Sequence, residues 1–151
     1  MDFFKLNCFF PFCTLAPGHV AAEIIVSKEN LHVSIGWFDS SVCFGEPGFE
    51  ERENILNGLL AAASSGFTSI LLNPDSNPLV DNHSAVQFLK KKSSETTTKI
   101  YPVANLTVDS NGKDLASLYD MKLAGAIAYG DYKKSIVDSS ILKIVQLKPT
   151  I

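Results

Sequence analysis

The chain has 151 residues, of which 46% are hydrophobic and 19% are charged, and this balance is typical of one globular domain, not of a disordered segment. The formal net charge of −3 gives no basic footprint for nucleic acid, and the run Lys90–Lys92 is interpreted as a solvated helix end. The three cysteines have no regular spacing, which argues against a disulfide framework and a structural zinc site and favours a reducing, cytoplasmic setting.

Residues 1–21 form a leader that is apolar and aromatic at its start, and three interpretations of it stay open. A signal peptide needs an uninterrupted apolar stretch, whereas Asn7 and Pro11 lie within this one, which is also too short to span a membrane. The alternatives are a buried strand and non-native sequence translated from a poorly chosen start site. Residues 22–151 show a regular pattern, so we treat them as one α/β unit.

From residue 22 onward, short apolar or β-branched runs alternate with stretches that have apolar residues at helical spacing. The pattern predicts strands over residues 22–26, 31–37, 68–72, 100–106 and 126–129, helices over residues 49–65, 83–92, 114–124 and 135–146, and loops over residues 44–48 and 73–78. Residues 38–42 lead into the first of these loops. Gly66 and Gly125 are predicted to end helices. In the second helix, Val86, Phe88 and Leu89 are expected to face inward.

This alternation of strands and helices predicts an α/β fold with parallel strands and right-handed crossovers. The four βα units could be half of an eightfold barrel or a small open sheet, and the pattern alone does not separate the two. The run over residues 68–72 is apolar for most of its length, which is typical of a strand covered on both faces.

Residues 36–50, which read GWFDSSVCFGEPGFE, carry a motif that resembles the dihydroorotase signature G-x-x-D-x-H-x-H-x-R-E-P-G-x-E. Residues 61–68 are similar to that family's A-A-A-x-G-G-F-T, and residues 73–78 are similar to its M-P-N-T-N-P. Residues 101–103 and 123–129 also resemble it. No single motif is decisive, but the matches lie in order and at consistent spacing, and together they make the resemblance specific.

The resemblance implies a class I dihydroorotase of the amidohydrolase superfamily. Such a protein is a hydrolase of pyrimidine biosynthesis that opens or closes the ring of dihydroorotate with one or two zinc ions. Its fold is a (β/α)8 barrel with a small β domain built largely from the ends of the chain. Residues 22–151 are therefore expected to form about the first four βα units, that is, a partial TIM-like barrel.

The metal site that the resemblance implies is degenerate. The family's two metal-binding histidines fall on Ser41 and Cys43, which follow Asp39. Residues two apart on a strand point to the same side, so the two imidazoles of His-x-His can bind one ion. In Ser-x-Cys the two side chains still point to the same side, but neither is an imidazole. Asp131 lies where some members carry a metal-bridging aspartate, and we interpret it as a solvated loop acid. No cofactor is therefore predicted, although the family uses zinc.

The substrate site that the resemblance implies is altered as well. The family's substrate-binding arginine falls on Gly45, which removes a bidentate donor for a carboxylate. Its substrate-binding asparagine falls on Asp75, whose charge would repel an anionic substrate, while Asn77 in the same loop matches the family. Together with the missing histidines, these changes predict a catalytically inactive protein.

The histidines of the chain offer no replacement for the lost ligands. His32 is expected in a strand, either packed or on the surface, and His83 is expected to be solvated near the start of a helix. His19 lies in the leader. No Ser-His-Asp or Cys-His arrangement has a supporting motif.

Three functional hypotheses follow, and whether the protein is an enzyme stays open. The first is an inactive dihydroorotase homologue that serves as a structural partner of aspartate carbamoyltransferase, a role that the resemblance implies for defective members. The second is an active cyclic amidohydrolase that interconverts dihydroorotate and carbamoyl-aspartate at a relocated metal site, built from Asp39, Cys43, Asp75 or Asp131. The third is a truncated fragment without a function of its own, whose exposed apolar edges would favour self-association. No nucleic-acid or membrane partner is predicted.

Overall fold

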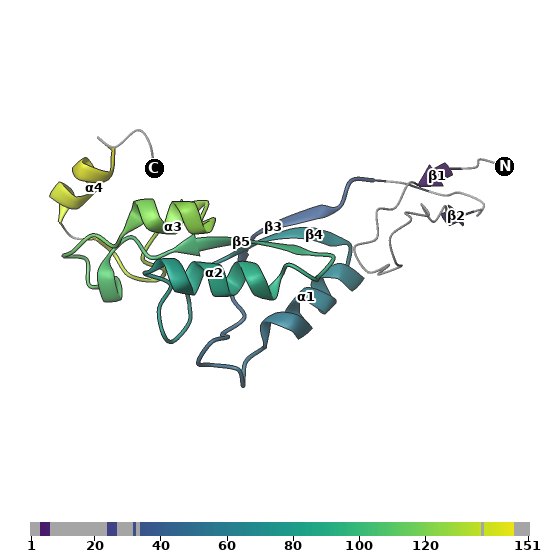
Figure 1. The fold of residues 1–151 in the computed structure, drawn as a ribbon, viewed down its shortest axis with the longest axis horizontal. Helices are drawn as coiled ribbons and strands as arrows, with labels where there is room; N and C mark the ends of the chain where they lie inside the picture. Colours follow the sequence, from purple (N-terminus) through teal and green to yellow (C-terminus); the bar gives the residue numbers. More distant parts are fainter. Residues whose placement is uncertain (1–3, 7–23, 27–31, 33, 137, 147–151) are drawn as a thin grey trace, which may run out of the picture. The chain divides into compact units, whose positions relative to one another are not determined.

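The computed structural model describes residues 4–6, 24–26, 32, 34–136 and 138–146, which belong to two compact units, Met1–Ile35 and Gly36–Ile151 (Figure 1). In the first unit, strand β1 (Phe4–Leu6) pairs antiparallel with strand β2 (Ile24–Val26). The predicted strand over residues 22–26 is therefore confirmed at residues 24–26. The predicted leader, residues 1–21, lies outside the described residues except for β1.

The second unit alternates strands and helices, as the sequence predicts. Its strands pair in the order β3-β4-β5-β6, every pair is parallel, and the sheet curls into half of a barrel (Figure 1). The predicted α/β class and partial TIM-like barrel are confirmed. In chain order the elements are β3 (Trp37–Val42), α1 (Ile55–Ser64), β4 (Phe67–Leu72), α2 (His83–Lys92), β5 (Lys99–Ala104), the 3-10 turn η1 (Val108–Ser110), α3 (Leu118–Ala124), β6 (Ala128–Tyr129) and α4 (Ser139–Gln146).

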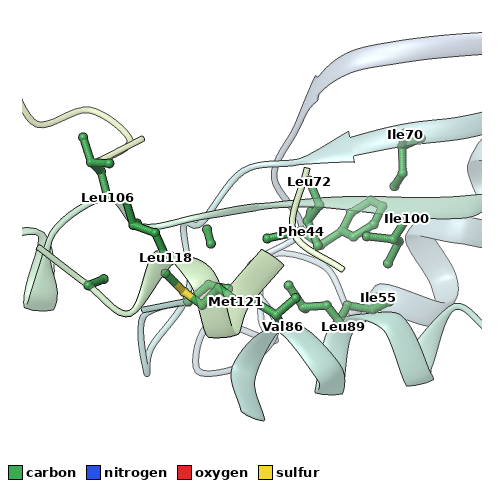
Figure 2. Packing of buried hydrophobic residues seen from close by; sticks show 14 of the residues in the cluster. Phe44, Ile55, Ile70, Leu72, Val86, Leu89, Ile100, Leu106, Leu118 and Met121 are labelled. Carbon is green, nitrogen blue, oxygen red and sulfur yellow. The ribbon is translucent and has the colours of Figure 1, made fainter. Parts of the chain in front are cut away.

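Helices cover one face of this sheet. Ile70 of β4 and Ile100 of β5 lie in one apolar cluster with side chains of α1, α2 and α3, including Ile55, Val86 and Met121 (Figure 2). A strand directs alternate residues to opposite faces, so burial alternates along β4 after the first residues of the strand. The prediction that residues 68–72 are covered on both faces is therefore wrong, because alternate positions stay partly exposed.

Strand β3 begins later than predicted. The sequence pattern placed a strand over residues 31–37, followed by residues that lead into a loop at 44–48, but the strand runs from Trp37 to Val42 and residues 34–36 lie outside it. Pairing starts where the amide of Trp37 donates to the carbonyl oxygen of Gly66, 3.0 Å away. The polar run at residues 39–41 belongs to the strand, although such residues are typical of loops.

Helix α1 is shorter than the predicted helix over residues 49–65. It begins at Ile55 because the side chain of Asn54 accepts the amide of Asn57 at 2.8 Å, which makes Asn54 the N-cap. The acidic residues at positions 50, 51 and 53 therefore precede the helix. The helix ends before Gly66, whose φ of 87° confirms the predicted role of this glycine.

Helix α2 has the predicted bounds. Asn82 caps it by accepting the amide of Ala85 at 3.0 Å, and Val86 and Leu89 are buried as expected. Phe88 was expected inside but is 37% exposed, because it lies two positions beyond Val86 and so on the other side of the helix. Among the helices of the described part, none is long and apolar enough to cross a membrane.

Helix α3 begins at Leu118, later than the predicted residue 114. The residues before it are held by a β-bridge between Thr107 and Leu115, which is incompatible with a helical backbone there. Gly125 ends the helix as predicted, with a φ of 106°. Helix α4 likewise starts later than predicted, at residue 139 and not at residue 135.

Glu46 connects the start of α1 to the end of α2. One carboxylate oxygen accepts the amide of Ile55 at 2.7 Å, and the other lies 2.8 Å from Nζ of Lys92. Burial raises the pKa of Glu46, but the hydrogen bond and charge of Lys92 and the amide of Ile55 outweigh it, so the pKa lies below its ordinary value of 4.5. The negative charge of Glu46 therefore stabilises the folded state.

We predict that Glu46→Gln lowers the free energy of unfolding at pH 7 by about 1–2 kcal/mol, because two charge-assisted hydrogen bonds are weakened. The contribution of Glu46 is fully present above the unfolded pKa of 4.5 and is lost as the pH falls through the lower folded pKa. Urea unfolding at pH 7 and at acidic pH measures this, and the difference between the two proteins should shrink as the pH falls through the folded pKa of Glu46. The exposed Glu51→Gln is the control, and an equal loss in both variants would contradict the assignment.

Candidate functional site

The carboxyl ends of the parallel strands bring several polar residues to one edge of the sheet. The loop after β3 contains Cys43, the loop after β4 contains Asn73 and Asp75, and the segment after β6 contains Asp131 and residues 132–133. In barrels of parallel strands, ligands bind at this edge. The candidate site is therefore this edge, which we call the strand-end cluster.

Ser41 and Cys43 share one partner. The side-chain amide of Asn73 donates to Oγ of Ser41 at 3.0 Å and lies 3.8 Å from Sγ of Cys43. Asp39 contributes from the same strand, where one of its carboxylate oxygens accepts the amide of Ser41 at 3.0 Å. The side chains of Ser41 and Cys43 therefore reach the same place, but each already contacts a neighbouring amide.

Tyr132 links the segment after β6 to the end of β3. A hydrogen bond with the exposed thiol of Cys43 raises the pKa of Tyr132, with smaller contributions from the charges of nearby groups. Nζ of Lys133 lies 4.7 Å from the centre of the Tyr132 ring, which is within the range of a cation–π contact. Residues far apart in the sheet order thus meet at the strand-end cluster.

Asp75 is paired with two cations. Its carboxylate lies 3.3 Å from Nη1 of Arg52 and 3.2 Å from Nζ of Lys133. The hydrogen bond to Asp75 raises the pKa of Lys133, which keeps this lysine charged. Because Arg52 and Lys133 are both more than half exposed, the pairs contribute little to stability. They nevertheless offset the negative charge of Asp75.

Gly45 is buried in the loop after β3, in a conformation that requires glycine. Its φ is 104°, and a Cβ added there would lie 2.6 Å from the carbonyl oxygen of Phe49. Next to it, the Phe44 ring packs so closely against α1 that a side chain at Gly58 would overlap it. An arginine at position 45 therefore does not fit this loop as it is folded.

Asn77 holds the neighbouring loop in place through its backbone. Its amide donates to the carbonyl oxygen of Pro47 at 2.8 Å, while its own carbonyl oxygen lies where a Cβ on Gly48 would be. The side chain of Asn77 is not part of any described contact with the strand-end cluster, so the structure gives this residue a role in loop packing.

The position of Asp131 differs from the one predicted. It was interpreted as a solvated loop acid, but it is only 8% exposed. Its carboxylate accepts the amides of Leu106 and Thr107, both at 3.0 Å, and also the hydroxyl of Thr107. The prediction is wrong because these donors, which follow β5, stabilise a buried carboxylate better than water does at the surface. Asp131 thus ties the segment after β6 to the end of β5.

The histidines add no ligands to this edge in the described part of the chain. His32 is exposed and lies outside any strand, contrary to prediction, and His83 is the first residue of α2 and is half-buried, not fully solvated. His19 lies outside the described residues. Among residues 34–136 and the other described positions, no group of three or more His, Cys, Asp or Glu side chains is placed to hold a metal ion. The donor set at the strand ends therefore does not fit zinc.

Four members of the strand-end cluster were not singled out from the sequence, namely Arg52, Asn73, Tyr132 and Lys133. Asn73 begins a motif that the sequence does reveal, but its side-chain contacts with Ser41 and Cys43 span about thirty residues. Arg52 and Lys133 meet Asp75 from positions 23 and 58 residues away. Contacts of this length leave no local pattern, so only the folded chain reveals them.

The sequence matches the family described as "Dihydro-orotase-like" over residues 32–146, and the chain belongs to this family. It is 36% identical over 122 residues to a dihydroorotase of Pelotomaculum thermopropionicum, an overlap that covers 81% of this chain and 28% of that protein. It is 39% identical over 109 residues to a dihydroorotase of Syntrophus aciditrophicus, covering 72% of this chain and 26% of that protein.

A dihydroorotase of Aquifex aeolicus gives a similar result, with 34% identity over 123 residues that cover 81% of this chain and 29% of that protein. The chain therefore spans less than a third of the length of the curated relatives it matches. The fold and the family agree with the resemblance seen in the sequence motifs. The chemistry of the strand-end cluster has to be judged from its own residues.

We predict that Asp131→Ala lowers the free energy of unfolding by about 3 kcal/mol, because three buried donors lose their acceptor. The matched control is Asp75→Ala, which removes exposed ion pairs and should cost less than about 1 kcal/mol. Urea unfolding of both variants measures the difference. If the two variants lost the same amount of stability, the buried hydrogen bonds of Asp131 would not stabilise the fold in the way described above.

Proposed function

We propose that this chain is a non-catalytic member of the dihydro-orotase-like family of pyrimidine biosynthesis. The observation that carries the proposal is that the polar side chains of the strand-end cluster form hydrogen bonds and ion pairs with neighbouring protein groups. Asn73 contacts Ser41 and Cys43, two cations pair with Asp75, and Asp131 is buried against the end of β5. Because these groups contact one another, they support a structural role for the described part of the strand-end cluster, in which no three His, Cys, Asp or Glu side chains are placed to hold a metal ion.

In this proposal, Ser41 and Cys43 occupy the positions of the family's two metal-binding histidines. A neutral hydroxyl is a poor zinc ligand, and a single thiolate does not replace two imidazoles. Metal ions supply this kind of hydrolysis with an activated water and a polarised carbonyl. Losing the ligands would remove both effects together.

The residues at the proposed substrate-binding positions also favour an inactive protein. We infer that Gly45 and Asp75 stand where the family carries an arginine and an asparagine that bind substrate. Gly45 offers no side chain, and the loop conformation leaves no space for one. Asp75 is an acceptor only, and its charge is already matched by Arg52 and Lys133. A dicarboxylate substrate would lose the directed donors that orient it.

A relocated metal site is the less favoured alternative. It needs at least three donors from Asp39, Cys43, Asp75 and Asp131 to converge on one point. The carboxylate of Asp131 is directed at Leu106 and Thr107, and that of Asp75 is directed at Arg52 and Lys133. No described contact favours convergence, so we keep the inactive protein as the proposal.

We predict that the folded chain shows no zinc-dependent hydrolysis of dihydroorotate and no zinc-dependent closure of carbamoyl-aspartate above background. Absorbance assays with added zinc test the activity, and isothermal titration calorimetry tests binding of the metal alone. The Aquifex aeolicus dihydroorotase, assayed alongside, is the positive control. A rate that depends on zinc and disappears in Cys43→Ala would favour the relocated site instead.

We further propose that the protein is a structural partner of aspartate carbamoyltransferase. A structural role requires a binding surface and not metal ligands, so it is compatible with the substitutions at residues 41, 43 and 45. The family's place in pyrimidine biosynthesis supports this choice of partner.

We predict a stable complex with aspartate carbamoyltransferase at micromolar concentrations, detected by co-elution in size-exclusion chromatography. The double variant Ser41→Ala, Cys43→Ala should bind equally well, because the role does not use the strand-end cluster. If the folded chain and the carbamoyltransferase elute separately at these concentrations, the partnership is rejected.

A further inference from the structure

Three loops at the carboxyl edge of the sheet meet at one carboxylate oxygen. Oδ2 of Asp75, in the loop after β4, lies 3.3 Å from Nη1 of Arg52 and 3.2 Å from Nζ of Lys133. Arg52 belongs to the segment between β3 and α1, and Lys133 follows β6. A single oxygen therefore accepts charge-assisted hydrogen bonds from two cations that lie 23 and 58 residues away in the sequence.

Both cations are held by contacts other than the one with Asp75. The guanidinium carbon of Arg52 lies 4.4 Å from the centre of the Phe49 ring, and Nζ of Lys133 lies 4.7 Å from the centre of the Tyr132 ring. Cation–π contacts at these distances are attractive and do not require a carboxylate. We therefore expect the two charges to stay close to their present positions when the carboxylate is removed.

The backbone also fixes the position of Lys133. Its φ is 60°, in the left-handed region that a residue with a Cβ adopts only at a cost in free energy. The turn that imposes this conformation is closed by the amide of Lys134, which donates to the carbonyl oxygen of Asp131 at 2.9 Å. Strained conformations of this kind gather at binding sites, where the surrounding structure holds them.

The loop that carries Asp75 has hydrogen bonds of its own. The amide of Asp75 donates to the carbonyl oxygen of Asn73 at 2.9 Å, and the hydroxyl of the buried Ser76 donates to the carbonyl oxygen of Pro78 at 2.9 Å. These bonds do not involve the carboxylate of Asp75. The backbone of the loop is therefore expected to persist when that carboxylate is replaced.

The exposed fractions of the three side chains suit a small anion. In the described part of the chain, the side chain of Asp75 is 25% exposed, whereas those of Arg52 and Lys133 are 52% and 66% exposed. The carboxylate is thus the most enclosed of the three groups, and solvent reaches both cations. An anion in its place would be partly shielded from water, which strengthens its attraction to the cations.

We propose that Arg52 and Lys133 form a binding site for a small carboxylate and that the side chain of Asp75 is the built-in occupant of this site. A ligand oxygen at the position of Oδ2 contacts both cations at once. Because Asp75 belongs to the same chain, its carboxylate has a high effective concentration at the site and excludes free carboxylates. The contact is therefore autoinhibitory.

The class of ligand follows from the resident group and from the charge of the chain. The group that now contacts both cations is a carboxylate, so an external carboxylate reproduces its charge and shape. The formal net charge of −3 provides no general attraction for anions, so binding would depend on the local pair of cations. The site requires no metal ion and no hydrolysis, and the inference is therefore independent of the proposed function.

Nuclear magnetic resonance tests the proposal directly. Arg52 is the only arginine of the chain, so the Nε–H signal of its guanidinium reports on the site without ambiguity. Sodium acetate is titrated into the 151-residue chain, with sodium chloride adjusted to keep the ionic strength constant. We expect the dissociation constant for acetate to be at least about threefold lower in Asp75→Ala than in the wild-type chain, because two exposed ion pairs become available to the ligand.

Three further variants make the result specific. Asp81→Ala is the matched control, because it changes the net charge equally but removes a carboxylate that accepts the amide of Asp109. It should bind acetate no better than the wild-type chain. Adding Lys133→Gln to Asp75→Ala should remove the gain. Asp75→Asn keeps the shape of the side chain without its charge and should show a gain in the same direction, which provides the test if Asp75→Ala folds poorly.

Circular dichroism establishes that each variant is folded. Equal affinity for acetate in the wild-type chain and in the folded Asp75 variants would overturn the proposal. It would also be overturned by an equal gain in Asp81→Ala, because the effect would then come from net charge. A gain that survives Lys133→Gln would show that the pair of cations is not the site.

Discussion

The second unit depends on a single layer of aliphatic side chains between its sheet and its helices. Ile70 and Ile100 project from neighbouring strands onto Ile55, Val86 and Met121, and all five are almost completely buried. Burying such side chains contributes about 1.5–3 kcal/mol each, which is the main force available to hold a parallel sheet under its helices. This layer holds the helices on the sheet, and the strand order of the sheet decides which residues meet at its carboxyl edge.

Much of this layer can be read from the sequence, because its signals are local. Helix α2 was predicted with its bounds since the cap at Asn82, the apolar spacing of Val86 and Leu89, and the lysines at its end all agree. Strand β3 lies further along the chain than the predicted strand over residues 31–37, because the polar run at residues 39–41 carries little local strand signal. There the pairing with β4 outweighs local preference.

The strand-end cluster could be predicted only in part. Asp39, Ser41, Cys43 and Asp75 stood out through a motif, and the structure places them at one edge of the sheet. The burial of Asp131 could not be foreseen, because its donors lie about 25 residues away and belong to a different strand end. The family and the fold follow from pattern and length, whereas the chemistry depends on which distant side chains meet.

The loop after β3 limits which single substitutions its glycines can accept. Gly45 adopts a left-handed backbone conformation against the carbonyl of Phe49, and Gly48 is similarly confined by Asn77. On the proposed equivalence of Gly45 with the family's arginine, an arginine introduced at position 45 alone would clash with the present loop. The backbone of the loop, and not only the identity of one residue, would therefore have to change before a side chain at this position could reach the strand-end cluster.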